Sequence, residues 1–544
     1  MQLSVLTETS EIAPQSSIEK IYAETSFFFL LVLTLPALSA STGSILEFFF
    51  KIQPLPNIFP ASIIASVGLT VFAFKTPWYR ICVYLSFLIA FLLVSYLNFD
   101  LSWDGLAYHQ RAIQHMVENK NLLLSSSGSI WADYYPKATW YFAAEVYRSL
   151  GDIQPGKIYH WLAALFIFSY SLRFSSKITH YKWAQYFFAS IIAFNPISIS
   201  QMETFYLDST LGVFTFAIIF SVTLIIKEDN RFDWLILIIS STIAINLKFS
   251  GFAPPFLGFS FLTAYTLLKR NFTLFNKCLL AGLIALFIAL GTLGFDPYIK
   301  NLLHGKHLLH PLYGQGKVDI MALNSPPGFT TRNRFTNLGV SILSKSENIS
   351  ELSGKTPQLK VPGTVFRSEL LGFEIPDVRL AGWGVLFSLA LISSFFAVNY
   401  RTLGIVLSTP LILIVLLTVV HPESWWARYS PQLIALPTLL ALYSSTIYAP
   451  SRRRKYLGIF IFLVLILNSL LVIPNKYHAT SVGNDFIKNS LVGYKGNHEV
   501  YELRGFIATP LLKRFNISPH LVSKEELEKD IGSFKKVQDF FYIK

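Results

Sequence analysis

Long apolar runs alternate with short polar segments along most of the 544-residue chain. A helix needs roughly twenty apolar residues to cross the hydrocarbon core of a bilayer, and windows of that length predict about thirteen spans. The predicted spans lie near 26–46, 58–74, 80–98, 158–174, 183–200, 210–227, 233–248, 250–268, 278–295, 380–398, 402–420, 431–449 and 456–473. The pattern therefore predicts an all-α polytopic membrane protein.

The polar remainder of the sequence falls into three larger pieces, which are the loops 99–157 and 296–379 and the tail 474–544. In the tail, 499–503 and 539–543 have strand-like composition, and Ser523 with Glu526 forms a capping-box pattern that predicts a short helix. We therefore expect a transmembrane domain over 1–473 and a small α/β domain over 474–544.

Composition excludes a soluble protein, because 52% of the residues are hydrophobic and only 14% are charged. The net charge of +13 does not indicate nucleic-acid binding, since the Lys and Arg residues lie in short loops between apolar runs. Long continuous runs also argue against the alternating pattern of a β-barrel. Cys82 and Cys278 both fall on the predicted cytoplasmic side, so we expect no disulfide between them.

Lysine and arginine accumulate in cytoplasmic loops, and this rule orients the chain. The basic run at 451–455 sets the cytoplasmic side, and counting backwards assigns the basic loops 75–80, 173–182 and 269–277 to the same side. The opposite side then receives the remaining polar segments, which are 99–157, 201–209, Lys248, 296–379, 421–430 and the tail. The chemically unusual segments therefore share one face, predicted to be the exterior.

Asp104 lies near the start of the most informative of these segments, 103–111, which follows an apolar run. A carboxylate at the membrane surface can accept a proton from a hydroxyl group while another substrate stays in the lipid. Tyr108, Arg111 and His115 follow Asp104 at helical spacing on one face of the expected surface helix. The alternative is that Asp104 only caps this helix, because Asp is a favoured N-cap residue.

Three further positions on the same face have comparable alternatives. Asp208 precedes an apolar helix, so it is either a cap or a site residue. Lys248 interrupts apolar sequence and either extends to water or binds an anion. Arg428 has the planar fork that phosphate oxygens favour, whereas Trp425 and Trp426 beside it are typical of a membrane interface.

Taken with 134–141 and the Ala-Arg-Tyr at 427–429, these segments resemble the GT-C glycosyltransferases that use polyprenyl-phosphate sugars, in particular the aminoarabinose transferases and protein O-mannosyltransferases. The resemblance implies that Asp104 is the catalytic base and that Lys248 and Arg428 bind the donor phosphate. It also implies a role for Asp208 in metal binding, acceptor orientation or support of the first loop. The sequence departs from the family in having Asp104-Gly105 for Asp-Glu and Pro136-Lys137 for Lys-Pro.

The resemblance thus predicts an inverting glycosyltransferase that moves a sugar from a polyprenyl-phosphate donor to a saccharide, lipid or protein acceptor. The expected location is a bacterial inner membrane, with membrane lipid around the protein and the site facing the periplasm. Predicted catalytic residues are Asp104 and Asp208, and predicted substrate-binding residues are Tyr108, His109, Arg111, Lys137, Lys248, Arg428 and Tyr429.

Two points stay open at this level. No cofactor is required by the pattern, although a divalent metal ion is an option at Asp208, and the spacing of His304, His307 and His310 does not favour a metal site. A lipid-linked saccharide transporter and a polysaccharide polymerase or ligase are the alternative functions. An internal repeat, which many transporters carry, is not visible in the sequence.

Overall fold

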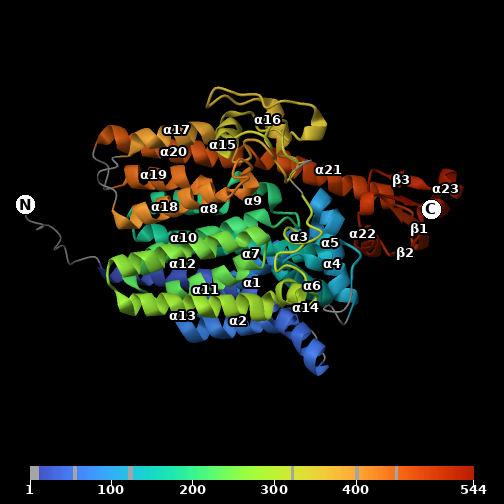
Figure 1. Ribbon diagram of the computed structural model, residues 1–544, viewed down its shortest axis with the longest axis horizontal. Helices are drawn as coiled ribbons and strands as arrows, with labels where there is room; N and C mark the ends of the chain where they lie inside the picture. Colours follow the sequence, from blue (N-terminus) through green and yellow to red (C-terminus); the bar gives the residue numbers. More distant parts are fainter. Residues whose placement is uncertain are drawn as a thin grey trace, which may run out of the picture.

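The computed structural model describes residues 12–52, 58–119, 126–319, 321, 324–398, 404–446 and 451–544. A bundle of long helices makes up most of it, and a small sheet lies beyond one end of the bundle (Figure 1). The predicted fold class, an all-α membrane protein with a small α/β C-terminal part, is confirmed.

Each of the thirteen predicted spans overlaps a helix of the structure, although several ends differ, by up to fourteen residues at the start of the first span, and 402–403 and 447–449 lie outside the described residues. These helices are α1 (Ile12–Phe50), α2 (Ile58–Phe74), α3 (Trp78–Leu97), α7 (Tyr159–Ser176), α8 (Lys182–Ala193), α10 (Asp208–Glu228), α11 (Arg231–Ile245), α12 (Ala253–Leu268), α13 (Phe272–Ile288), α17 (Phe387–Ala397), α18 (Ile405–Val420), α19 (Ala435–Ser445) and α20 (Arg452–Leu470). Among the described residues, six helical segments are long and apolar enough to cross a membrane. The shorter apolar helices are α2, α17 and part of α18.

Helix α10 forms the centre of the bundle. It packs against α7, α11, α12 and α18, and nearly all of its side chains are buried. A helix that is apolar on every side is stable only when protein or lipid surrounds it completely. By contrast, α3 and α13 leave large apolar side chains such as Phe87 and Leu283 exposed, as expected of helices that face lipid.

The two long loops contain short helices that cover the same end of the bundle. The first loop holds η1 (Gly105–His109), α4 (Gln110–Glu118), α5 (Ile130–Tyr134), α6 (Ala138–Leu150) and η2 (Gln154–Ile158). The second holds η5 (Phe295–Ile299), α14 (Lys300–Leu303), α15 (Arg334–Leu343), η6 (Glu351–Ser353) and α16 (Arg367–Gly372). Helix α6 is almost entirely buried, and it packs against α1 and α4.

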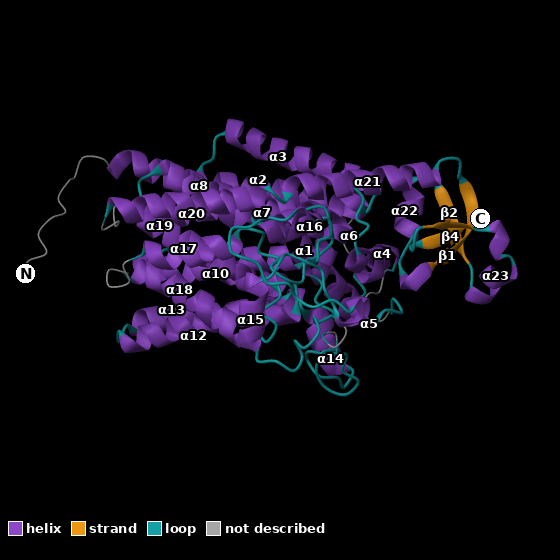
Figure 2. Cartoon of the chain, turned by 90° about the horizontal axis from the view of Figure 1, so that it is seen from above, coloured by secondary structure: helices purple, strands orange, loops and turns teal. Residues whose placement is uncertain are grey.

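The C-terminal part begins with α21 (Ile473–Leu491), a helix that the sequence pattern did not predict. It leads to β1 (Gly496–Glu502), β2 (Ile517–Leu521), β3 (Lys535–Val537) and β4 (Phe541–Ile543), with α22 (Thr509–Arg514) and α23 (Lys524–Lys529) between the strands. The strand order is β2-β1-β4-β3, with β1 and β2 parallel. Figure 2 shows the strands in orange, with α22 and α23 beside them. The predicted capping box of Ser523 and Glu526 is present at the start of α23.

Candidate functional site

A cavity of ≈ 230 Å³ lies at the end of the bundle that carries the two long loops. We call it the Asp104 cavity. Five separate parts of the chain supply its walls, which are the first loop, the start of α10, the α11–α12 connection, the second long loop and the segment after α18. It is lined by Trp103, Asp104, Ala107, Tyr108, His109, Trp131, Tyr135, Tyr206, Leu207, Asp208, Lys248, Asn324, Arg428 and Tyr429.

Asp104 directly precedes η1, and its side chain makes no capping hydrogen bond. The capping explanation for this residue is therefore wrong. The turn that follows is a π-helix, in which the backbone N–H of Gln110 donates to the carbonyl oxygen of Gly105. Because a π turn contains more residues than an α turn, Asp104, Tyr108 and His109 all reach the cavity.

Arg428 lies opposite Asp104, in the single turn η8 (Ala427–Tyr429). Its guanidinium nitrogens lie 3.5 Å from Asp104 Oδ2, 3.7 Å from Asp208 Oδ2 and 3.4 Å from Asp377 Oδ1. All three ion pairs are longer than a well-formed charge-assisted hydrogen bond. Arg428 is thus surrounded by three carboxylates but bound tightly by none.

Lys248 reaches the same group from the α11–α12 connection. Its Nζ donates to Asp208 Oδ1 at 2.7 Å and lies 3.8 Å from the centroid of the Tyr429 ring. The connection is held close to α11 because Gly251 packs on the carbonyl oxygen of Ala244, where an added Cβ would lie only 1.8 Å from that oxygen. Asp208 is the first residue of α10 and also makes no capping bond. Its carboxylate instead orients Lys248.

The sequence analysis missed Asp377 and Arg379, which come from the end of the second long loop. Asp377 pairs with Arg428, and Arg379 Nη2 donates to Asn324 Oδ1 at 2.8 Å. Burial lowers the pKa of Arg379, and Asp377 partly opposes this effect. Neither residue belongs to a recognisable motif, since the loop has no periodic pattern. Only the tertiary structure brings them next to Arg428 and Asn324, which line the cavity.

Two predicted substrate-binding residues do not line the cavity. Arg111 pairs with Glu502 of the C-terminal part at 3.2 Å, because the π turn rotates it away from Asp104. Lys137 is buried, and its Nζ binds Asp296 Oδ1 at 2.9 Å. Both residues join segments of the fold to one another.

Aromatic rings form the remaining wall around Asp104. The Nδ1 of His109 accepts a hydrogen bond from Trp140 Nε1 at 2.8 Å, and burial lowers the pKa of His109 to about 3. His109 is therefore neutral at physiological pH, with its proton on Nε2. Tyr108 packs edge-on against Tyr135, and both line the cavity. Such a wall offers flat apolar faces beside hydroxyl groups.

Burial sets the ionisation of Asp104. It raises the pKa of this carboxyl to about 6, and the guanidinium of Arg428 opposes the rise. Asp377 and Asp208 increase it further through charge repulsion. A carboxylate with a pKa close to neutral is suited to accept a proton.

A metal ion does not fit the residues around Asp208. Its two oxygens face Lys248 and Arg428, which are both cationic. Within the described ranges, no group of three or more His, Cys, Asp or Glu side chains is placed to hold a metal. The carboxylate of Asp208 therefore faces two cationic side chains.

Among the comparisons with known proteins, the one with solved structures gives a match. The chain is similar to the crystal structure of ArnT from Cupriavidus metallidurans bound to undecaprenyl phosphate, with a TM-score of 0.41 and 12% sequence identity. The similarity covers 82% of this chain and 87% of that chain. No family model matches the chain, and no curated protein matches it.

Proposed function

We propose that this protein is a membrane glycosyltransferase that moves a sugar from a polyprenyl-phosphate carrier to an acceptor hydroxyl on the outer face of the membrane. The observation that carries the proposal is the meeting of one carboxylate, Asp104, with two cations, Lys248 and Arg428, in a single cavity. These residues are far apart in the sequence. A base beside a cationic pair is the arrangement that sugar transfer from a phosphate requires.

In this proposal Lys248 and Arg428 bind the phosphate of the carrier. When the bond between the anomeric carbon and the phosphate oxygen breaks, its electron pair stays on that oxygen, and negative charge develops there. Fixed cations in a site of low dielectric stabilise such charge strongly. Arg428 can turn its fork to the phosphate because its present ion pairs are long, and Asp208 keeps Lys248 in place.

Asp104 acts as the general base. The acceptor hydroxyl attacks the anomeric carbon from the side opposite the leaving phosphate, and Asp104 takes its proton as the new bond forms. This displacement inverts the anomeric configuration. The Tyr108 and Tyr135 rings offer stacking surfaces for the sugar, and the ≈ 230 Å³ volume allows one sugar ring to enter.

The test begins in cells with and without the gene, by mass analysis of lipid-linked sugars and envelope glycans. We expect one polyprenyl-phosphate sugar to accumulate and one glycan to lose that sugar. The purified protein should then transfer the sugar from this donor. A transporter would move the lipid-linked sugar without forming a new glycosidic bond, and a polymerase would use an oligosaccharide on a diphosphate carrier. Either result would contradict the proposal.

The proposal also requires the Asp104 cavity to face outward. Cys82 and Cys278 can be replaced, and single cysteines introduced at the exposed positions Ser353, Ser533 and Ser451. A membrane-impermeant thiol reagent added to intact cells should label the first two, whereas Ser451→Cys should react only after permeabilisation. Labelling of Ser353→Cys and Ser451→Cys from the same side would refute this orientation.

A further inference from the structure

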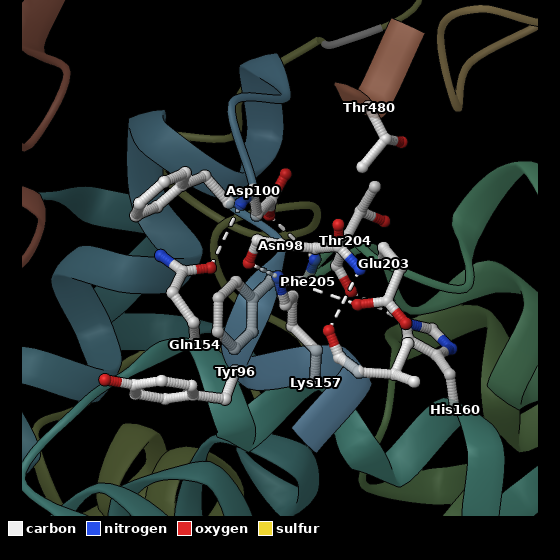
Figure 3. Close-up of polar contacts among 12 residues, drawn as sticks. Tyr96, Asn98, Asp100, Gln154, Lys157, His160, Glu203, Thr204, Phe205 and Thr480 are labelled. Carbon is white, nitrogen blue, oxygen red and sulfur yellow. Dashed lines mark hydrogen bonds and ion pairs between the residues drawn. The ribbon is translucent and has the colours of Figure 1, made fainter. Parts of the chain in front are cut away.

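Asp100 is a buried carboxylate that the proposed reaction does not use. It lies four residues before Asp104, is only 2% exposed and does not line the Asp104 cavity. Its Oδ1 accepts the backbone N–H of Ser102 at 2.9 Å. Its Oδ2 accepts the backbone N–H of Phe205 at 2.8 Å (Figure 3). One carboxylate therefore binds the backbone just before Asp104 and the backbone just before Asp208.

The main chain of Asp100 is fixed as well. Its N–H donates to Gln154 Oε1 at 3.0 Å, and its carbonyl oxygen accepts from Gln110 Nε2 at 2.9 Å. Gly105, the residue after Asp104, packs directly on the carboxylate. An added Cβ at Gly105 would lie 2.1 Å from Asp100 Oδ2, so no larger residue fits without moving Asp100. This contact gives a physical reason for glycine where the resembling family has glutamate.

The neighbours of Asp100 attach this segment to the C-terminal part. Phe99 is buried in the hydrophobic cluster that contains Val500, Leu512 and Phe541, and Leu101 packs against the same cluster. The backbone N–H of Ile507 also donates to the carbonyl oxygen of Leu106 in η1 at 3.0 Å. The segment before Asp104 is therefore held from both sides.

We propose that Asp100 is a positioning residue that sets the relative placement of Asp104 and Asp208 by binding the backbone of both segments. It touches no substrate itself. This inference rests on the proposed function. It adds that the same carboxylate holds the segments of Asp104, which is the base, and of Asp208, which orients Lys248. The C-terminal part supports this anchor through Phe99, which gives that part of the chain a role in the site.

Burial raises the pKa of the Asp100 carboxyl, and the positive charge of Lys157 opposes this rise. Lys157 is fully buried, donates from Nζ to the carbonyl oxygen of Asn98 at 2.6 Å and lies 3.8 Å from Glu203 (Figure 3). Lys157 and Lys476 both act on Asp100 electrostatically. An Asp100→Asn change keeps the size of the side chain but replaces one accepting oxygen by an NH₂ group. Either Ser102 or Phe205 then loses its hydrogen-bond acceptor.

Amide hydrogen exchange tests this proposal without any enzyme assay. In Asp100→Asn, exchange should rise roughly tenfold or more in 102–109 and in 203–208, because a buried N–H without an acceptor weakens the local structure. The matched control is Asp233→Asn, which alters an equally buried carboxylate at the opposite end of the bundle. That control should leave both segments unchanged. Unchanged exchange in Asp100→Asn, or a rise spread over the whole chain, would overturn the proposal.

Gly105→Ala is the second variant, in case Asp100→Asn does not fold. The atoms nearest to the added Cβ belong to Asp100 and Ser102. Faster exchange in 203–208 must therefore be transmitted through Asp100. If 203–208 keeps its wild-type exchange in Gly105→Ala, Asp100 does not couple the two segments.

Measurement of kcat tests whether the hydrogen bonds of Asp100 affect the reaction. Misplacement of the base should lower kcat roughly ten- to hundred-fold in Asp100→Asn. The affinity for undecaprenyl phosphate should fall much less than kcat, because Asp100 reaches Lys248 only indirectly, through Asp208. Equal kcat in wild type and variant would refute a positioning role. Absence of sugar transfer by the wild type would instead refute the proposed function, and the exchange data would still decide the role of Asp100.

Discussion

Two arginine–aspartate groups, at opposite ends of the helical bundle, show how similar residues serve different purposes. Away from the Asp104 cavity, Arg173 Nη2 lies 2.7 Å from Asp233 Oδ2, and its Nε donates to Oδ1 at 3.2 Å. The hydroxyl of Tyr170 also donates to Asp233 Oδ1 at 3.0 Å. This pair is bidentate, buried and saturated with partners.

Arg428 is different in each of these respects. It faces three carboxylates at 3.4 to 3.7 Å and lines a cavity, where a ligand can reach it. A tight buried pair holds helices together, whereas a cation with several long contacts can exchange one of them for a phosphate. Geometry rather than residue type therefore distinguishes Arg428, the proposed phosphate ligand, from Arg173.

The largest expected effect is that of Asp104→Asn. Loss of the proton acceptor should lower the rate of sugar transfer roughly 10²- to 10⁴-fold. The melting temperature should hardly change, because the side chain makes no capping bond and its ion pair with Arg428 is long. Transfer by purified protein from the identified donor, together with thermal unfolding, measures both. A rate near that of the wild type would remove Asp104 from the mechanism.

Asp233→Ala should lower the stability of the protein and leave its turnover unchanged, which is the opposite of the result expected for Asp104→Asn. This change leaves Arg173 buried without its partner, which typically costs about 3–5 kcal/mol of stability. Turnover per folded molecule should remain at the wild-type level, since the pair is remote from the Asp104 cavity. Thermal unfolding and active-site-normalised rates separate the two effects. A loss of turnover greater than the loss of folded protein would contradict the contrast between the two ends.

The dependence of kcat/KM on pH should be a smaller but diagnostic effect. The base acts only when ionised, and burial raises the pKa of Asp104 to about 6. The rate should therefore be constant above this pH and fall about tenfold per pH unit below it. Asp233→Asn should keep this profile in whatever fraction folds. A profile that stays flat to pH 5 would show that another group accepts the proton.

The bundle was largely predictable, because each span is a long apolar run ended by polar residues. Helix α2 matches its predicted bounds, since its apolar run is clearly delimited. Helix α21 was missed, because 474–491 is mostly polar. Few of its side chains are buried. Two of these, Ile487 and Leu491, pack in the hydrophobic core of the C-terminal part.

The site was predictable only where residues stand in a local motif. Asp104 and Lys248 were found because each follows or interrupts an apolar run, and Arg428 was found through the Ala-Arg-Tyr at 427–429. The π turn after Asp104 could not be predicted, and an ordinary helical register therefore placed Arg111 in the site. Asp377 reaches Arg428 only through the fold of the second long loop.

Binding of undecaprenyl phosphate to the purified protein tests the proposed role of Arg428 most directly. Wild type, Arg428→Lys and Arg173→Lys form a matched set, because each variant replaces one arginine fork by a point charge. Arg428→Lys should bind the phosphate more weakly, by about tenfold or more, because one charge-assisted contact to phosphate is lost. Binding to folded Arg173→Lys should equal that of the wild type. Equal affinity in all three proteins would contradict the claim that the loosely held Arg428 is the group that binds the carrier phosphate.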